Sequence, residues 1–486
     1  KELVITAGVR WQPEFMPTDY FHRGSQFNEA DMVAGVQSTV YPNSPAGVFY
    51  YGDKGVPKNY TQNSPWQFSP RVGLTWNPDG AGKTVLRFGG AMIYDEPNFF
   101  TAQRNQQNPP FATAAQTLPT DAPLDFADPW SSGSAPGNPF PQPAIPPSDV
   151  AFPATAQYIF LPHHFHPPYV IQWTASIQRE LPHSWMAQVD YIGNETAHQT
   201  WGFPLNPAVY TSGKPSANYT TRFRLYLENP TEGSKFNGGG GGTVLVNDSA
   251  TANYNGLVAT IQHRAANFTF LANYTWSHCL DVEDAQGDFA GTTVEDPYNP
   301  GLDRANCDFD HRGMFNANGV VTSNFKSLHG VGGAIVNNWE LGPLLRITDG
   351  SVFTVTDGTD ISGIDVNNDR PNLTGSATYT HNQMWKDPHY LNQGAFVYQP
   401  NGTFGNLGRN TFRGAKYVDL DAEISRFFPI TERTKLDLRI EAFNALNHPN
   451  FNNPGHTSVN SSASTFSQVT GAGEPRIWQG ALKFIF

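Results

Sequence analysis

Apolar and polar residues alternate with a period of two along many stretches of the chain. In LDLRIEAFNALNHPNF (436–451), the apolar residues on one side of an extended chain are Leu436, Leu438, Ile440 and Ala442. The charged residues on the opposite side are Asp437, Arg439 and Glu441. A period of two is the pattern of a β-strand and not of a helix. The segment therefore predicts a strand with one apolar and one charged face, followed by a loop rich in Asn and Pro.

The same alternation recurs often enough to predict an all-β chain of about twelve antiparallel strands. Their approximate positions are 2–11, 66–77, 83–95, 168–181, 185–194, 253–265, 267–278, 311–322, 330–348, 416–428, 434–447 and 476–486. Bacterial single-chain barrels of the outer membrane use an even number of such strands.

The links between these strands alternate strictly in length. The short links are 77–83, 182–184, 265–267, 324–329 and 429–433. The long links are 12–65, 96–167, 195–252, 279–310, 349–415 and 448–475. A soluble sandwich shows the same strand pattern, but short turns at one end and long loops at the other are typical of an outer-membrane barrel. We therefore expect an antiparallel transmembrane β-barrel with short periplasmic turns, long extracellular loops and Phe486 on the periplasmic side.

Composition supports long loops and argues against several partners. Only 15% of the 486 residues are charged and 45 are Gly, whereas about 25% charge is usual in soluble proteins. The net charge of −12 argues against nucleic-acid binding. The sequence contains no run of about 18 apolar residues, so it predicts no transmembrane helix. The chain begins with Lys1 in a strand pattern that lacks the features of a signal peptide, so we expect a processed or truncated product.

Several segments carry a resemblance to a known family. They are FSPRVGLTWNPDGAGKTVLRFGGAMIYDE (68–96), YNGLVATIQHRAANFTFLANYTWSHCLD (254–281), DRANCDFDHRGMFN (303–316), DVNNDRPN (365–372) and LDLRIEAFNALNHPNF (436–451). In this order the chain resembles the Oar-like branch of TonB-dependent outer-membrane receptors over almost its whole length. The final EPRIWQGALKFIF resembles an insertion signal ending in an aromatic residue, with Trp478, Leu482, Phe484 and Phe486 as its apolar residues.

The resemblance implies a function and a set of partners. Such receptors have 22 strands, an N-terminal plug, a TonB-contacting box and often an upstream regulatory-like β domain. Residues 1–486 match only the C-terminal part of that barrel, about 12 strands, so the plug and the box are not seen. The implied role is energy-coupled uptake of a bulky carbohydrate, peptide or metal chelate across the bacterial outer membrane. The implied partners are membrane lipid, the TonB complex through the plug, and the barrel-assembly machinery through the last strand.

Charged residues of two neighbouring predicted strands are candidates for the barrel lumen. They are Asp419, Asp421, Glu423, Lys435, Asp437, Arg439 and Glu441. An Arg or Lys side chain that faced lipid at the membrane centre would destabilise the barrel by about 2 to 4 kcal/mol, so the lumen is the preferred side for these charges. The residues could line a solute path or bind the plug. Alternatively, they form a hydrated wall in which opposite charges neutralise each other.

The only two cysteines, Cys279 and Cys307, lie at the two ends of one long link. In an oxidising compartment a disulfide between them would stabilise the loop by about 3 to 4 kcal/mol in the chain-entropy model. Two unrelated free thiols are the alternative.

The sequence predicts no metal, no cofactor and no enzyme activity. His163, His164 and His166 match no zinc spacing, so a solvated loop is expected there. In DVNNDRPN, the spacing of Asp365, Asn367 and Asp369 is like the start of a calcium loop. The sharp-turn Gly and the bidentate Glu are missing, which favours a local network of Asx turns. GAGKT (80–84) lacks the first Gly of a phosphate loop, and no catalytic motif is present.

Two other functions fit the sequence. One is a self-contained passive pore of about twelve strands. The other is a secreted soluble β protein that binds glycans through its aromatic loops. Aromatic loop residues could stack on sugars or peptides, but they could equally pack the loops together; examples are Tyr50, Tyr51, Phe99, Phe100, Tyr219 and Tyr226. No loop motif identifies the nutrient.

Overall fold

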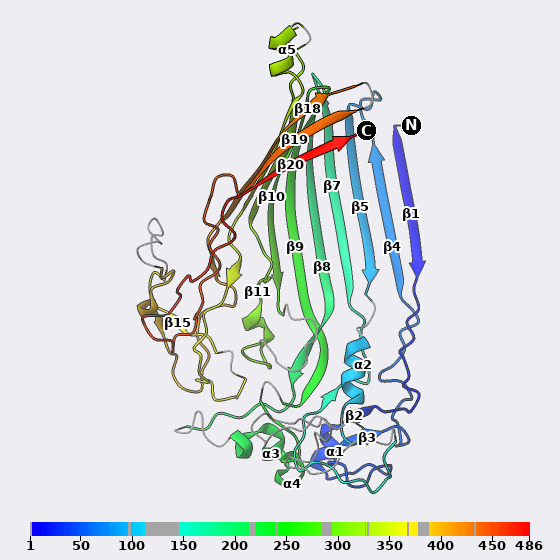
Figure 1. The fold of residues 1–486 in the computed structure, drawn as a ribbon. Coiled ribbons are helices and arrows are strands. Elements are labelled where there is room, and N and C mark those ends of the chain that lie inside the picture. Colours follow the sequence, from blue (N-terminus) through cyan, green and yellow to red (C-terminus); the bar gives the residue numbers. More distant parts are fainter. Residues whose placement is uncertain are drawn as a thin grey trace, which may run out of the picture.

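The computed structural model describes residues 2–95, 99–111, 145–212, 219–239, 242–283, 294–325, 327, 330–366, 369–377, 388–431 and 434–486. Figure 1 shows one tall, curved sheet, with both chain termini near one end of its strands and most of the remaining chain gathered at the other.

The sheet is a meander in which each long strand pairs with the next long strand along the chain. Twelve strands form the path β1 (Leu3–Trp11), β4 (Phe68–Trp76), β5 (Thr84–Tyr94), β7 (Tyr169–Leu181), β8 (Trp185–Pro204), β9 (Val244–Ala265), β10 (Phe268–Asp281), β12 (Gly313–Thr322), β13 (Trp339–Thr348), β18 (Tyr417–Pro429), β19 (Lys435–Phe443) and β20 (Ile477–Ile485). Every neighbouring pair on this path is antiparallel. The prediction of twelve antiparallel strands is confirmed.

Shorter elements occupy the links. The short strands are β2 (Ser25–Phe27), β3 (Val48–Tyr50), β6 (Ile159–Phe160), β11 (Ala305–Asn306), β14 (Val352–Phe353), β15 (Asn372–Leu373), β16 (Phe396–Val397) and β17 (Phe412–Arg413). The helices are α1 (Glu29–Val33), α2 (Phe99–Gln106), α3 (Arg224–Glu228), α4 (Pro230–Gly233) and α5 (Gly330–Val336), with 3-10 turns η1 (Tyr219–Arg222), η2 (Pro300–Asp303) and η3 (Gln393–Ala395). All of them except α5 belong to the long links, which lie at the end of the sheet away from the termini (Figure 1).

One predicted strand was wrong in its first half. Residues 330–336 form helix α5, and the strand begins only at Trp339. Gly330 and Asn338 adopt left-handed backbone angles, with φ of +67° and +66°, and they mark the two ends of the helical turn. The apolar residues between them gave no clear period, so a short helix and a strand could not be told apart there.

Two predicted strands were too short. β8 and β9 continue through 195–204 and 244–252, which the sequence assigned to a loop. Their pairing is irregular between Thr196 and Gln199 and again between Gln199 and Trp201. A bulge inserts an unpaired residue and shifts the alternation, so the period of two is lost although the strands go on.

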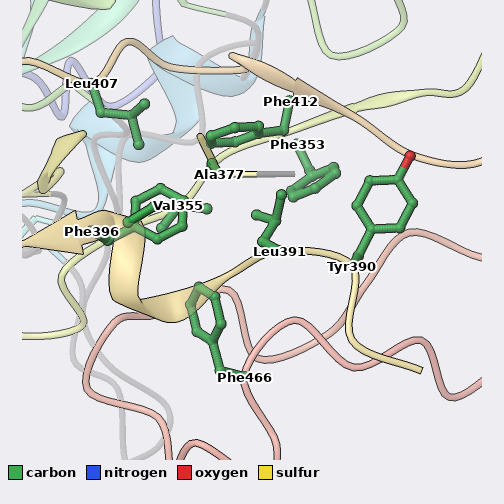
Figure 2. Close-up of a cluster of buried hydrophobic side chains, with 10 residues drawn as sticks. Phe353, Val355, Ala377, Tyr390, Leu391, Phe396, Leu407, Phe412 and Phe466 are labelled. Carbon is green, nitrogen blue, oxygen red and sulfur yellow. The ribbon is translucent and has the colours of Figure 1, made fainter. Parts of the chain in front are cut away.

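The buried hydrophobic clusters lie mostly in the links and not against the long strands. The first loop core combines the links before β4, β7 and β9 and contains Met32, Tyr41, Val48, Tyr50, Tyr158, Phe160, Leu205, Leu225 and Phe236. The second loop core combines the links before β18 and β20 and contains Phe353, Val355, Ala377, Tyr390, Leu391, Ala395, Phe396, Leu407, Phe412 and Phe466 (Figure 2). The long loops are therefore folded layers with interiors of their own.

Candidate functional site

The charged residues of β18 and β19 meet around one guanidinium. Arg439 Nε lies 3.2 Å from Oε1 of Glu423 on the neighbouring strand. Its other two nitrogens lie 3.6 Å from carboxylate oxygens of Asp437 and Glu441. Contacts across the two strands and along β19 require that all four side chains share one face of the sheet. We call these four residues the charged wall.

The other three predicted lumen residues have separate contacts. Asp419 Oδ2 accepts a hydrogen bond of 3.1 Å from the Tyr417 hydroxyl. Asp421 Oδ1 accepts one of 3.0 Å from the backbone N–H of Asn444. The Lys435 ammonium lies 5.0 Å from the centre of the Phe427 ring. The structure thus joins four of the seven residues in one network and places the remainder beside it on the same two strands.

The opposite face of these strands is apolar and exposed. Ile440 is paired with Ile424, and the two side chains are 48% and 47% exposed. On β20, Trp478 and Leu482 pair with Ala442 and Leu438, so they extend the same face. Trp478, Leu482, Phe484 and Phe486 are all exposed. A continuous exposed apolar surface of this kind is typical of contact with a membrane or another protein.

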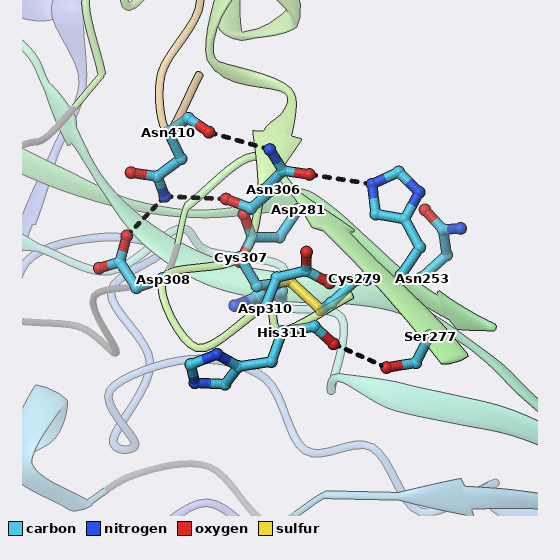
Figure 3. The surroundings of a disulfide bond; sticks show 12 residues. Asn253, Ser277, Cys279, Asp281, Asn306, Cys307, Asp308, Asp310, His311 and Asn410 are labelled. Carbon is cyan, nitrogen blue, oxygen red and sulfur yellow. Dashed lines mark hydrogen bonds between the residues drawn. A yellow bond between two sulfur atoms is a disulfide. The ribbon is translucent and has the colours of Figure 1, made fainter. Parts of the chain in front are cut away.

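The disulfide predicted between Cys279 and Cys307 is present, which confirms that prediction (Figure 3). Cys279 lies near the end of β10 and Cys307 follows β11, and their Cα atoms are 5.4 Å apart. The backbone N–H of Cys279 donates to Oδ1 of Asp310 at 2.7 Å. We call the link 279–310, which contains this disulfide, the disulfide loop. Asp310 also forms an ion pair with Arg413, so the disulfide loop is attached to the link before β18.

Arginines of that link hold buried carboxylates of the disulfide loop. Arg370, whose side chain is only 2% exposed, lies 2.5 Å from Asp303 and 2.6 Å from Glu295. Its Nε also donates to the backbone carbonyl of Leu407 at 2.9 Å. Burial raises the pKa of Glu295 to about 7, although the positive charge of Arg370 opposes this rise. A second buried arginine, Arg409, pairs with Asp281.

These contacts explain two of the segments that carried the family resemblance. Asp303 and Asp310 belong to DRANCDFDHRGMFN, and Arg370 belongs to DVNNDRPN. Sequence reasoning did not join the two segments. The only signal available was that the first segment is rich in Asp and the second contains an Arg.

Of the calcium-like spacing in DVNNDRPN, the two described carboxylates, Asp365 and Asp369, both lie near Asp360. Asn367 lies outside the described residues. The carboxylate that organises this turn is Asp360, which accepts hydrogen bonds from the backbone N–H groups of Gly363 and Asp365 at 2.6 and 2.9 Å. The pattern is that of Asp side chains in turns.

Of the three histidines of the link before β7, His163 and His164 stay together, with ring centres 4.9 Å apart, whereas His166 has other partners. His163 contacts Gln62, with 3.2 Å between the side-chain nitrogens. His166 instead lies beside His198 and Asp248, and the ligand atoms of these three residues are within 4.8 Å of one another. His166 Nδ1 is 2.9 Å from Asp248 Oδ2. His198 sits in the irregular part of β8 with φ of +58°, a position that sequence analysis had assigned to a loop.

Comparison of the sequence with models of protein families identifies the family to which the chain belongs. The family model described as "Outer membrane beta barrel domain" matches residues 1–479. The chain belongs to this outer membrane β-barrel family. It is accordingly a protein of the bacterial outer membrane, which overturns the soluble glycan-binding alternative.

Solved structures similar to this outer membrane β-barrel domain include one transporter and two receptors. The outer membrane transporter YddB from Escherichia coli has 8% identity and a TM-score of 0.46, over 87% of this chain and 41% of that chain. A mutant of the ferric enterobactin receptor PfeA from Pseudomonas aeruginosa has 11% identity and a TM-score of 0.41, over 86% of this chain and 40% of that chain. The ferripyoverdine receptor of the same organism, bound to ferripyoverdine, has 10% identity and a TM-score of 0.37, over 86% of this chain and 33% of that chain.

The outer membrane β-barrel domain thus spans between a third and two fifths of the length of these three structures. No curated protein matches the chain. Among the described residues, the helices are all too short or too polar to cross a membrane.

Proposed function

We propose that this outer membrane β-barrel domain is the C-terminal part of a TonB-dependent transporter that takes up a bulky nutrient by energy-coupled transport. The rest of the barrel, a plug and a TonB-contacting box would be supplied by other parts of the protein. The Oar-like sequence segments support this proposal over a simple pore.

The observation that carries the proposal is the folded state of the long loops. Two loop cores of buried aromatic and aliphatic side chains hold them together, and the buried Arg370 fastens one loop to the next. Tyr50 illustrates the effect, because it is 1% exposed and donates its hydroxyl to the backbone carbonyl of Pro109 at 2.8 Å. A rigid, preformed surface binds a large ligand with a smaller loss of conformational entropy than mobile loops do.

The charged wall supports a water-filled interior. In the proposed orientation Arg439 and its three carboxylates face the lumen, and Ile424, Ile440 and Trp478 face lipid. The reverse orientation would expose Arg439 to lipid at a cost of about 2 to 4 kcal/mol near the membrane centre. Three carboxylates around one guanidinium leave negative charge over, which can accept hydrogen bonds from a plug or interact with a passing solute.

The remaining partners follow from the same assignment. The exposed aromatic residues of β20 would be recognised by the barrel-assembly machinery during insertion. The complex of TonB would act through the plug and not through the strands described here. The side chains exposed on the outside of the loop layers would make the first contact with the nutrient.

The proposal is tested by uptake in the source bacterium. Cells that lack this gene, cells that lack TonB and cells treated with a protonophore are supplied with labelled oligosaccharides, peptides and ferric chelates. We expect uptake of the same compound to be lost in all three cases. Uptake that depends on this gene but persists in the protonophore, and that rises in proportion to external concentration, would indicate a passive pore instead.

A further inference from the structure

Three side chains beside the second loop core carry buried polar atoms that lack partners among the described residues. Asp357 is 0% exposed, and neither of its carboxylate oxygens has a hydrogen-bond partner. Gln399 is 4% exposed, and neither its amide oxygen nor its amide nitrogen has one. Asp369 is 2% exposed and has one unpartnered oxygen, Oδ1. Such groups are rare in folded proteins, and each needs a physical explanation.

Asp357 lies close to both of the other side chains. The backbone N–H of Asp357 donates to the carbonyl oxygen of Asp369 at 2.8 Å, which holds the two segments side by side. The carboxamide of Gln399 lies close enough to Asp357 to lower the pKa of its carboxyl group, without a hydrogen bond of good geometry. Burial has the larger effect and raises that pKa to about 6, and the charge of Asp369 raises it further.

The surrounding charges do not neutralise these carboxylates. Asp360 raises the pKa of Asp369, although burial is the main cause of that rise. A nearby buried cation, Arg370, is already bound to Glu295 and Asp303. An isolated buried carboxylate costs several kcal/mol unless a cation or a set of donors compensates it.

We propose that Asp357, Asp369 and Gln399 bind a calcium ion that fastens three segments of the link before β18 beside the second loop core. Calcium takes carboxylate and amide oxygens in flexible geometry, which these three side chains supply. They offer no imidazole or thiolate, the ligands that favour zinc, copper or nickel.

The location explains what the ion would do. Asp357 follows Val355, which is fully buried in the second loop core (Figure 2). On the other side, the backbone N–H of Asn460 donates to the carbonyl oxygen of Asp357 at 3.2 Å. The link before β18 and the link before β20 therefore meet at this residue. An ion bound there would fix the link before β18 in its folded arrangement at the point where Asn460 of the other link contacts it, which goes beyond the transport function proposed above.

Asp365 provides a matched control. It was the first residue of the calcium-like spacing, but its backbone N–H is bound by Asp360 and its pKa reflects burial and Asp360, with no effect from Asp357 or Asp369. Its φ of +64° is a conformation that Asn also tolerates. Asp365→Asn therefore removes one charge from the same loop without touching the proposed ligands.

The test measures calcium binding to the full-length protein, purified in detergent and freed of metal with EGTA. Calorimetric titration with CaCl₂ should show one site fewer, or an affinity lower by about tenfold or more, in Asp357→Asn, because the number of charged ligands sets calcium affinity. Asp365→Asn should bind like the wild type. MgCl₂ should bind more weakly than CaCl₂, since magnesium requires near-ideal octahedral geometry and sheds its water reluctantly.

Thermal melting adds a result that a merely structural role would not give. In EGTA, Asp357→Asn should melt at a higher temperature than the wild type, because it removes an uncompensated buried charge. In calcium the order should reverse. The same order in both conditions, or no calcium binding by the wild type, would overturn the proposal and assign the cluster to trapped water.

If Asp357→Asn does not reach the membrane, Gln399→Met keeps the net charge and approximate size of the side chain. It should weaken calcium binding as well, and unchanged binding in that variant would overturn the proposal. Because neither measurement uses a nutrient or TonB, failure here would leave the proposed transport function untouched.

Discussion

Arg370 offers the most direct perturbation of the loop layer. Arg370→Met removes the guanidinium but keeps a long apolar side chain in its place. Two carboxylates that are 1% and 0% exposed, those of Glu295 and Asp303, would then be buried without their cation. Removing one partner of a buried ion pair typically costs about 3 to 5 kcal/mol. We expect a loss of that size in the local stability of the disulfide loop, while the long strands stay paired.

Hydrogen exchange measured by mass spectrometry reports this loss segment by segment. Amides in 294–312 should exchange faster in the variant, and amides of β18 and β19 should not change. The matched control is Lys416→Met. Lys416 forms an ion pair with Asp349 at 3.2 Å, and the two side chains are 71% and 31% exposed. An exposed pair of this kind contributes about 0 to 1 kcal/mol, so exchange in the control should stay close to that of the wild type.

The pH dependence separates lost charge from lost packing. The charge of Arg370 lowers the pKa of both Glu295 and Asp303, so without it both carboxyl groups bind protons more readily, and the destabilisation by Arg370→Met should be smaller at pH 5 than at pH 8. A loss caused by packing alone would be the same at pH 5 and pH 8. Equal exchange in wild type and Arg370→Met at pH 8 would refute the view that Arg370 fastens the two loops.

Three other predictions follow from the same contacts. Replacing both Cys279 and Cys307 with Ser should destabilise the loop by about 3 to 4 kcal/mol in the chain-entropy model, measured as faster exchange of its amides; unchanged exchange would mean that the Asp310 contacts suffice. Ile440→Arg should reduce assembly into native outer membranes, at a cost of about 2 to 4 kcal/mol, whereas Arg439→Ile should assemble normally; the opposite ranking would reverse the two faces. In EGTA the loops should lose protease resistance as pH rises from about 4.5 to about 7. Glu295 binds its proton more tightly in the folded protein, where its pKa is about 7, so the stability gained from that proton disappears as the pH rises to this value. Resistance that increases over this pH range would contradict the burial of Glu295.

The long strands could be predicted because each has two chemically different faces. In β19, Leu438 and Ile440 alternate with Asp437 and Arg439, and a shift of one residue would exchange the two faces. The prediction failed where that alternation is absent. Past Thr196 the bulges of β8 disrupt it, and in α5 a Gly-rich apolar stretch fits either a helix or a strand.

The loop contacts could not be predicted because their partners are far apart in the sequence. Arg370 is 67 residues from Asp303, and Arg409 is 128 residues from Asp281. No local spacing encodes such pairs, and many loop residues could have been their partners. The disulfide was predictable for the opposite reason, since the chain has only 2 cysteines. His166 was grouped with its sequence neighbours, whereas its actual partners lie on β8 and β9.

The most direct test of the central claim is the intact mass and N-terminal sequence of the protein extracted with detergent from native outer membranes. We expect a species much heavier than 53.5 kDa that begins upstream of Lys1 and includes a plug, as the C-terminal part of a TonB-dependent transporter requires. A detergent-requiring species of 53.5 kDa that begins at Lys1 would contradict this assignment and indicate a small passive pore.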